Sequence, residues 1–142
     1  MKISARNQFK GKIEAVKAGA VNSEVDLALP GGQKIVAIVT NDSAKSLGLA
    51  VGQEAVALVK ASSVLVMTDA SGMRISARNC LSGKVKALSM GPVNAEVGIE
   101  VAGGTVVHAT ITHAAVDELG LKEGSAATAV FKAPSVILGV SA

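Results

Sequence analysis

The chain is an internal tandem repeat, and this repeat constrains the fold more than any other feature. The sequence Met-Lys-Ile-Ser-Ala-Arg-Asn of Met1–Asn7 returns as Met-Arg-Ile-Ser-Ala-Arg-Asn at Met73–Asn79, an offset of 72 residues. At this offset residues 1–68 align with residues 73–140 without a gap, and 28 of the 68 pairs are identical. We therefore expect two structural units, a first domain at 1–68 and a second at 73–142. A residue present in both copies is also a better candidate for shared chemistry than a residue present in one.

The size and composition of each copy predict a small core of aliphatic side chains. A unit of about 70 residues buries only about 60% of the surface of its unfolded chain, so we expect further burial between the copies or between chains. Apolar residues make up 49% of the sequence, but there are two Phe, no Tyr and no Trp. Small aliphatic and β-branched residues of this kind suit thin, strongly curved sheets.

Hydrophobic periodicity predicts mainly strands, separated by glycine-containing turns. In the first copy the predicted strands are Lys2–Asn7, Phe9–Val16 with a bend or bulge at Gly11, Glu24–Leu29, Lys34–Thr40, Gln53–Lys60 and Val64–Met67. Thr40–Ser43 offers N-cap side chains for a short helix over Ala44–Leu47, and Gly48 can end it. Thr112 and Gly120 are the equivalent residues of the second copy. The predicted fold class is all-β, with two tandem OB-like small β-barrels that each carry one short helix. The copies are joined by a four-residue linker, Asp69–Gly72.

The charge and hydropathy of the chain favour a small soluble partner. No run approaches the roughly 20 apolar residues of a membrane-spanning helix, and Met1–Ser4 lacks the apolar core of a signal peptide. A cytoplasmic location without membrane contact is therefore the default expectation. The net charge is +3, and the Lys and Arg residues are scattered along the chain. Scattered cations match a small anion better than they match a nucleic-acid backbone.

The potential metal ligands do not recur between the copies. His108 and His113 align with Val36 and Asn41, and the single cysteine, Cys80, is best interpreted as a small strand side chain. A His/Cys cluster cannot therefore exist in both units, and no bound metal cation is expected.

The pattern of acidic residues argues against catalysis. Glu24 and Glu96 are the only acidic residues that recur, and they lie on the polar face of a predicted strand. Such carboxylates are usually solvated or ion-paired. No nucleophile, base and orienting group recur together, so we expect no enzyme activity.

An OB-like nucleic-acid-binding or protein-interaction module is the alternative function. OB-folds hold single strands on aromatic side chains within a cationic groove. The only aromatic residues are Phe9 and Phe131, which align with Leu81 and Val59 and are therefore predicted core positions. The composition thus argues against nucleic acid as a partner.

Three small polar patches recur, and nearly all of their polar groups are hydrogen-bond donors. The patches are Ser4, Ala5, Arg6 and Asn7 with Ser76, Ala77, Arg78 and Asn79; Lys60, Ala61, Ser62 and Ser63 with Lys132, Ala133, Pro134 and Ser135; and Val21 and Asn22 with Val93 and Asn94. A tetrahedral oxyanion presents only acceptor oxygens and needs converging donors. The first two patches begin and end a repeat, where the strands of a small barrel can be neighbours, and the third could form an anion-binding nest of N–H groups. The residues alone leave two interpretations open, an oxyanion site or ordinary solvated strand ends and turns.

The recurring motifs also resemble a known family. Each copy contains Ser-Ala-Arg-Asn, a following Gly-Lys, Val-Asn-x-Glu-Val, a Gly-Gly hairpin, Leu-Gly-Leu-x-x-Gly and Lys-Ala-[Ser/Pro]-Ser-Val. Together they resemble the Mop family of molybdate-binding (molbindin) domains, and two units in tandem resemble the di-Mop cytoplasmic molbindins. The resemblance covers nearly the whole chain.

The resemblance implies a function, an assembly and a set of site residues. It implies intracellular binding and storage or homeostasis of molybdate or tungstate, by a homotrimer that holds the oxyanions at subunit contacts. It places the anion between Ser4–Asn7 and Lys60–Ser63 and between Ser76–Asn79 and Lys132–Ser135, with the Val21–Asn22 and Val93–Asn94 turns supplied by a neighbouring domain or chain. Pro134 replaces the serine of the first copy and removes a hydroxyl and an N–H, so the two sites should differ in affinity.

Overall fold

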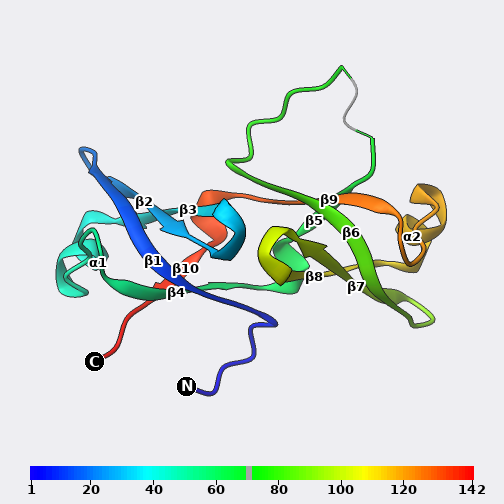
Figure 1. The fold of residues 1–142 in the computed structure, drawn as a ribbon, viewed down its shortest axis with the longest axis horizontal. Coiled ribbons are helices and arrows are strands. Elements are labelled where there is room, and N and C mark those ends of the chain that lie inside the picture. The colour runs from blue at the N-terminus through cyan, green and yellow to red at the C-terminus, as the bar shows by residue number, and fades with distance from the viewer. Residues whose placement is uncertain (70–71) are drawn as a thin grey trace.

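The fold is built twice from the same succession of elements (Figure 1). A computed structural model describes residues 1–69 and 72–142, so Ala70 and Ser71 of the predicted linker lie outside the described residues. The first copy contains β1 (Asn7–Ala18), β2 (Asn22–Ala28), η1 (Pro30–Gly32), β3 (Lys34–Thr40), α1 (Asn41–Ser46), β4 (Glu54–Val59), η2 (Ala61–Ser63) and β5 (Leu65–Met67). The second contains β6 (Asn79–Met90), β7 (Asn94–Val101), η3 (Ala102–Gly104), β8 (Val106–Thr112), α2 (His113–Leu119), β9 (Ala126–Phe131), η4 (Ala133–Ser135) and β10 (Ile137–Gly139). The η elements are single 3₁₀ turns. The predicted all-β class with one short helix per copy is confirmed.

The strand predicted at Lys2–Asn7 is wrong. The first strand begins at Asn7, so three strands precede the helix rather than four. The register explains the difference. Asn7 lies opposite Val59, the last residue of β4, and after Val59 the chain leaves the sheet and enters η2. Residues before Asn7 therefore have no neighbouring strand to pair with.

The two helices are short and begin at threonine caps. The Thr40 Oγ1 accepts a hydrogen bond from the Ser43 N–H at 3.1 Å, and the Thr112 Oγ1 accepts one from the Ala115 N–H at 3.0 Å. Both caps satisfy N–H groups that the first helical turn leaves free, as predicted. α1 begins at Asn41, earlier than the sequence indicated. No helix among the described residues is long and apolar enough to cross a membrane.

Each sheet curls because its first strand pairs along both edges. The N-terminal half of β1 pairs with β4 and its C-terminal half with β2, and Lys12 lies opposite both Ala28 and Glu54. A side chain at Gly11 would strike the carbonyl oxygen of Ala28, so glycine lets the strands approach at the bend. The bulge itself lies between Ile13 and Ala15. The bend and bulge together give the curvature of an OB-like barrel.

The two copies exchange their last strands. The sheet orders are β10-β4-β1-β2-β3 and β5-β9-β6-β7-β8, and all pairs are antiparallel. β10 therefore completes the sheet of the first copy, where Leu138 lies opposite Ala57. In return β5 pairs with β9, with Val66 opposite Ala129. Each barrel thus contains a strand from the other repeat.

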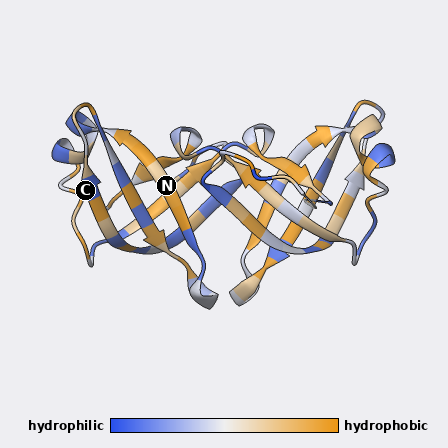
Figure 2. Ribbon diagram, turned by 90° about the horizontal axis from the view of Figure 1, so that it is seen from above, coloured by the Kyte–Doolittle hydropathy of each residue, from blue (hydrophilic) through white to orange (hydrophobic). Residues whose placement is uncertain are grey.

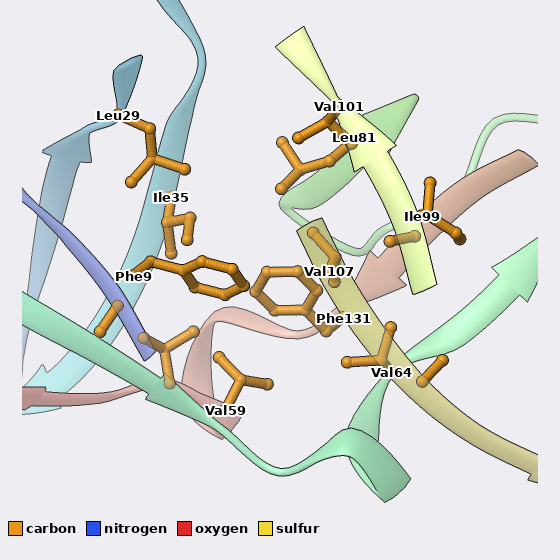
Figure 3. Close-up of a cluster of buried hydrophobic side chains, with 14 of the residues drawn as sticks. Phe9, Leu29, Ile35, Val59, Val64, Leu81, Ile99, Val101, Val107 and Phe131 are labelled. Carbon is orange, nitrogen blue, oxygen red and sulfur yellow. The ribbon is translucent and has the colours of Figure 1, made fainter. Parts of the chain in front are cut away.

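A single hydrophobic cluster runs through both barrels. Figure 3 shows the rings of Phe9 and Phe131 next to each other where the two barrels meet. Both residues are buried, as predicted. Val64 of the first copy lies on the side of Phe131 and Val107, which is a consequence of the strand exchange. Figure 2 shows the barrels side by side, with apolar and polar residues alternating along the strands. The burial expected between copies is therefore present within one chain.

Candidate functional site

The structure brings the first two polar patches of each copy to neighbouring strand ends. Asn7 lies opposite Val59, so Arg6 comes directly before this strand pair and Lys60 directly after it, at the same end. In the second copy Asn79 lies opposite Phe131, which places Arg78 in the same relation to Lys132. Of the predicted site residues, these are exposed: Ser4, Arg6, Lys60, Ser62, Ser76, Arg78, Lys132, Pro134, Val21, Asn22, Val93 and Asn94. Ala5, Ser63, Ala77 and Ser135 are half-buried, and Ala61 and Ala133 are buried.

The turn η2 presents several free donors at this strand end. Its own hydrogen bonds run from the Ser63 N–H to the Lys60 carbonyl at 2.9 Å and from the Val64 N–H to the Ala61 carbonyl at 3.3 Å. The N–H groups of Ala61 and Ser62 are not used by the turn. The Lys60 ammonium has no carboxylate partner within the described part of the chain. A full positive charge and neutral donors therefore lie together without a neutralising group.

The equivalent turn η4 has the same hydrogen-bond geometry, but Pro134 stands in place of Ser62 and offers neither an N–H nor a hydroxyl. The Ser135 N–H bonds the Lys132 carbonyl at 3.0 Å, and the Val136 N–H bonds the Ala133 carbonyl at 3.2 Å. Pro134 occupies a position whose N–H the turn does not need, which explains why proline fits there without changing the backbone. The substitution therefore removes donors and leaves the fold intact.

The side-chain amides of Asn7 and Asn79 make structural hydrogen bonds between the two copies. The Asn7 amide donates to the His108 carbonyl at 2.8 Å and accepts from the His108 N–H at 2.7 Å. Asn79 makes the same pair of bonds with Val36, each at 2.8 Å. Both asparagines are 1% exposed. Each amide therefore joins one copy to an edge strand of the other, through its oxygen and one of its N–H groups.

The recurring glutamates are ion-paired with the recurring arginines across the two copies. The Arg6 guanidinium contacts the Glu96 carboxylate at 2.5 Å, and Arg78 contacts Glu24 at 2.6 Å. The two glutamates are therefore ion-paired, which is one of the two states expected from the sequence. In the sequence, these arginines and glutamates recur at equivalent positions of the two copies. That recurrence did not show that each arginine pairs with the glutamate of the other copy. Lys60 and Lys132, by contrast, have no carboxylate partner among residues 1–69 and 72–142.

The third patch lies away from the other two within the chain. Val21–Asn22 and Val93–Asn94 are at the β1–β2 and β6–β7 turns, which Figure 1 shows at the outer ends of the molecule. Asn41 supports the first turn by donating to the Gly19 carbonyl at 3.0 Å, and His113 contacts the Gly91 carbonyl at 2.8 Å in the second. The turns are held firmly but do not join the donor set of either strand end in a single chain.

The site chemistry is that of anion binding. Ammonium, hydroxyl and N–H groups all donate, and such donors suit a ligand that only accepts hydrogen bonds. No group of three or more His, Cys, Asp or Glu side chains that could hold a metal ion occurs within residues 1–69 and 72–142. The fold and site together define a tandem OB-like barrel protein with two donor-rich, cationic strand ends.

Comparison with known proteins identifies the family. The TOBE domain matches residues 3–66 and 75–138, which covers most of both repeats. The chain belongs to the TOBE domain family and carries two such domains in tandem.

Several relatives are similar over the full length of this chain. It is 43% identical over 140 residues to the molybdenum transport protein ModE of Herbaspirillum seropedicae, covering 99% of this chain and 52% of that protein. It is 44% identical over 140 residues to the molybdenum-pterin-binding protein MopA of Rhodobacter capsulatus, covering 99% and 53%. The chain thus spans about half the length of these curated relatives.

A solved structure matches the whole fold. It is a crystal structure of the cytoplasmic molybdate-binding protein ModG, in a PEG-grown form with molybdate bound. The two chains are 59% identical, the TM-score is 0.96, and the match covers 99% of this chain and 100% of that one. The tandem OB-like architecture is therefore shared along the entire chain.

Proposed function

We propose that this protein binds molybdate, or tungstate, as the intact oxyanion and serves in its storage and homeostasis in the cytoplasm. The observation that carries the proposal is the unpaired lysine of each repeat, Lys60 or Lys132, next to serine and N–H donors and opposite the Ser-Ala-Arg segment. The molybdate-loaded structure of ModG and the molybdenum-related relatives support the same ligand. Binding requires no catalysis, and each repeat, 1–68 and 73–142, supplies one donor set.

The donor set favours a large tetrahedral anion. Charge-assisted hydrogen bonds from lysine and neutral bonds from hydroxyls reach the ligand only if its oxygens extend to all donors at once. No bond between the metal atom and the protein is needed. The first set can offer the Ser62 hydroxyl and N–H, which Pro134 cannot. We therefore expect the first-repeat site to bind the anion more tightly.

We also propose that the site is completed in a homotrimer. Eight of the ten large exposed apolar residues among the described residues form pairs that recur between the copies at or beside the polar patches: Met1 with Met73, Ile3 with Ile75, Val21 with Val93, and Leu65 with Ile137. Val21 and Val93 are each 71% exposed, although they flank the proposed turns. Recurrent exposed apolar side chains of this kind mark a contact surface. Assembly would bring the outer turns of one chain to the strand ends of another.

We expect the protein to be a trimer whose thermal stability rises when molybdate is added. A ligand that binds only the folded, assembled state stabilises that state by mass action. Light scattering would give the mass, and a melting curve with and without molybdate would give the shift, with sulfate as the control anion. A monomer whose melting temperature does not change with molybdate would contradict both the assembly and the site.

Replacing Lys60 by alanine should weaken molybdate binding by about ten- to a hundredfold, because a charge-assisted bond contributes about 1.5–3 kcal/mol. Lys10→Ala is the matched control, since Lys10 is an exposed lysine of the same barrel that has Ser82 as its equivalent. It should leave molybdate affinity unchanged. Calorimetric titration with molybdate and then sulfate would measure both. Equal losses for the two variants, or a sulfate affinity as high as that for molybdate, would overturn the proposed site.

A further inference from the structure

A second cationic pocket lies at the junction of the two copies, on one side of the molecule. It has a volume of about 360 Å³ and is lined by the start of β1, by η1 and by the start of β8. We call it the junction pocket. Its volume falls in the range of sites for small organic molecules and is much larger than a single tetrahedral oxyanion requires.

Three basic side chains line the junction pocket, and no carboxylate does. These are Arg6, Lys10 and His108. Arg6 is paired with Glu96, whereas the Lys10 ammonium and the His108 ring have no hydrogen-bond or ion-pair partner among the described residues. An ammonium offers three donors, and an imidazole offers an N–H in either neutral tautomer. Two donors are therefore free on the wall of one pocket.

The rest of the lining is partly apolar and is held in place. Phe9 and Leu29 are almost fully buried and line the pocket together with Pro30. The two hydrogen bonds between Asn7 and the His108 backbone fix β1 against β8 across the pocket. The positions of Lys10 and His108 relative to the apolar lining are therefore fixed without a ligand.

The equivalent place on the other side of the molecule lacks these features. Ser82 stands where the first side has Lys10, and its hydroxyl is hydrogen-bonded to Thr128 at 3.0 Å. Val36 stands in place of His108 and is buried. The free Lys10 and His108 side chains are thus specific to one junction, which is not expected if they only solubilise a repeated surface.

We propose that the junction pocket binds a phosphate monoester of a small organic molecule. The phosphate accepts hydrogen bonds from Lys10 and His108, and the organic part lies against Phe9, Leu29 and Pro30. A doubly charged phosphate offers the Lys10 ammonium and the His108 N–H more charge and more acceptor oxygens than a carboxylate does. The junction pocket shares Arg6 with the Ser-Ala-Arg segment of the proposed molybdate site, but Arg6 is held by Glu96, and the pocket includes neither Lys60 nor Lys132.

The test is a titration of the full chain with phenyl phosphate, with and without saturating molybdate, in which NMR monitors the two histidine rings. His108 lines the pocket and should shift saturably, whereas His113, which contacts Gly91 and Asp117, should not. Lys10→Ala should weaken binding at least about tenfold. Lys12→Ala, on the same strand but outside the pocket lining, should bind like the wild type.

Inorganic phosphate and benzoate should each bind more weakly than phenyl phosphate, because one lacks the apolar part and the other lacks the second charge. The proposal is overturned if inorganic phosphate binds as tightly as phenyl phosphate. It is also overturned if both histidines shift in parallel, if Lys10→Ala binds like the wild type, or if molybdate abolishes the His108 shift. Molybdate affinity is measured on the same Lys10→Ala protein, so failure of this site and failure of the molybdate site are distinguishable.

Discussion

Replacing Asn79 by alanine is expected to lower the free energy of unfolding by about 2–5 kcal/mol. The Asn79 amide satisfies both the N–H and the carbonyl of Val36, at 2.8 Å each, in a fully buried position. Alanine leaves both backbone groups without a partner, and each unsatisfied buried group costs about 1–3 kcal/mol. Urea denaturation at a fixed protein concentration would measure the change.

The equivalent Asn7→Ala provides an internal comparison. Its bonds to His108 are only partly buried, so water can replace part of what is lost, and we expect a smaller destabilisation. Gln8→Ala, whose side chain makes one exposed hydrogen bond to the Ala5 carbonyl, should change stability by less than about 0.5 kcal/mol. If Asn79→Ala is no less stable than Gln8→Ala, the amide does not join the two copies in the way described.

The repeat and its hydrophobic alternation predicted the fold class because they depend only on local sequence. The strand period, the threonine caps and the glycine turns all act within a few residues of one another. The strand exchange could not be predicted in this way. β5 and β10 have the same pattern whether they pair within their own repeat or with the other, and only the path of the chain after η2 and η4 decides between these partners.

The site was predicted in part for the same reason. Recurrence identified the lysine turns and the Ser-Ala-Arg segments, and the antiparallel register places each turn and segment at the same end of a strand pair. Recurrence also selected Asn7 and Asn79, because a structural contact repeats as faithfully as a binding contact does. The junction pocket was missed because Lys10 and His108 do not recur, and a search for repeated chemistry discards such residues.

Replacing Gly31 by alanine should destabilise the protein by about 2–5 kcal/mol, because the two glycine hairpins pack against each other. Gly31 has φ +86°, which costs alanine about 1–2 kcal/mol, and its Cβ would lie 2.6 Å from the backbone of Ala102 and Gly103. Relieving such an overlap costs about 1–3 kcal/mol more. Gly32 is the matched control, since its φ is +85° but nothing lies within 4 Å of its Cβ position. Gly32→Ala should therefore lower the free energy of unfolding only by the cost of the positive φ, about 1–2 kcal/mol. Equal losses of unfolding free energy for the two variants in urea would show that η1 and η3 can move apart at little cost. The exchanged strands, the asparagine contacts, the Arg–Glu pairs and the shared core would then hold the two barrels together without the hairpins.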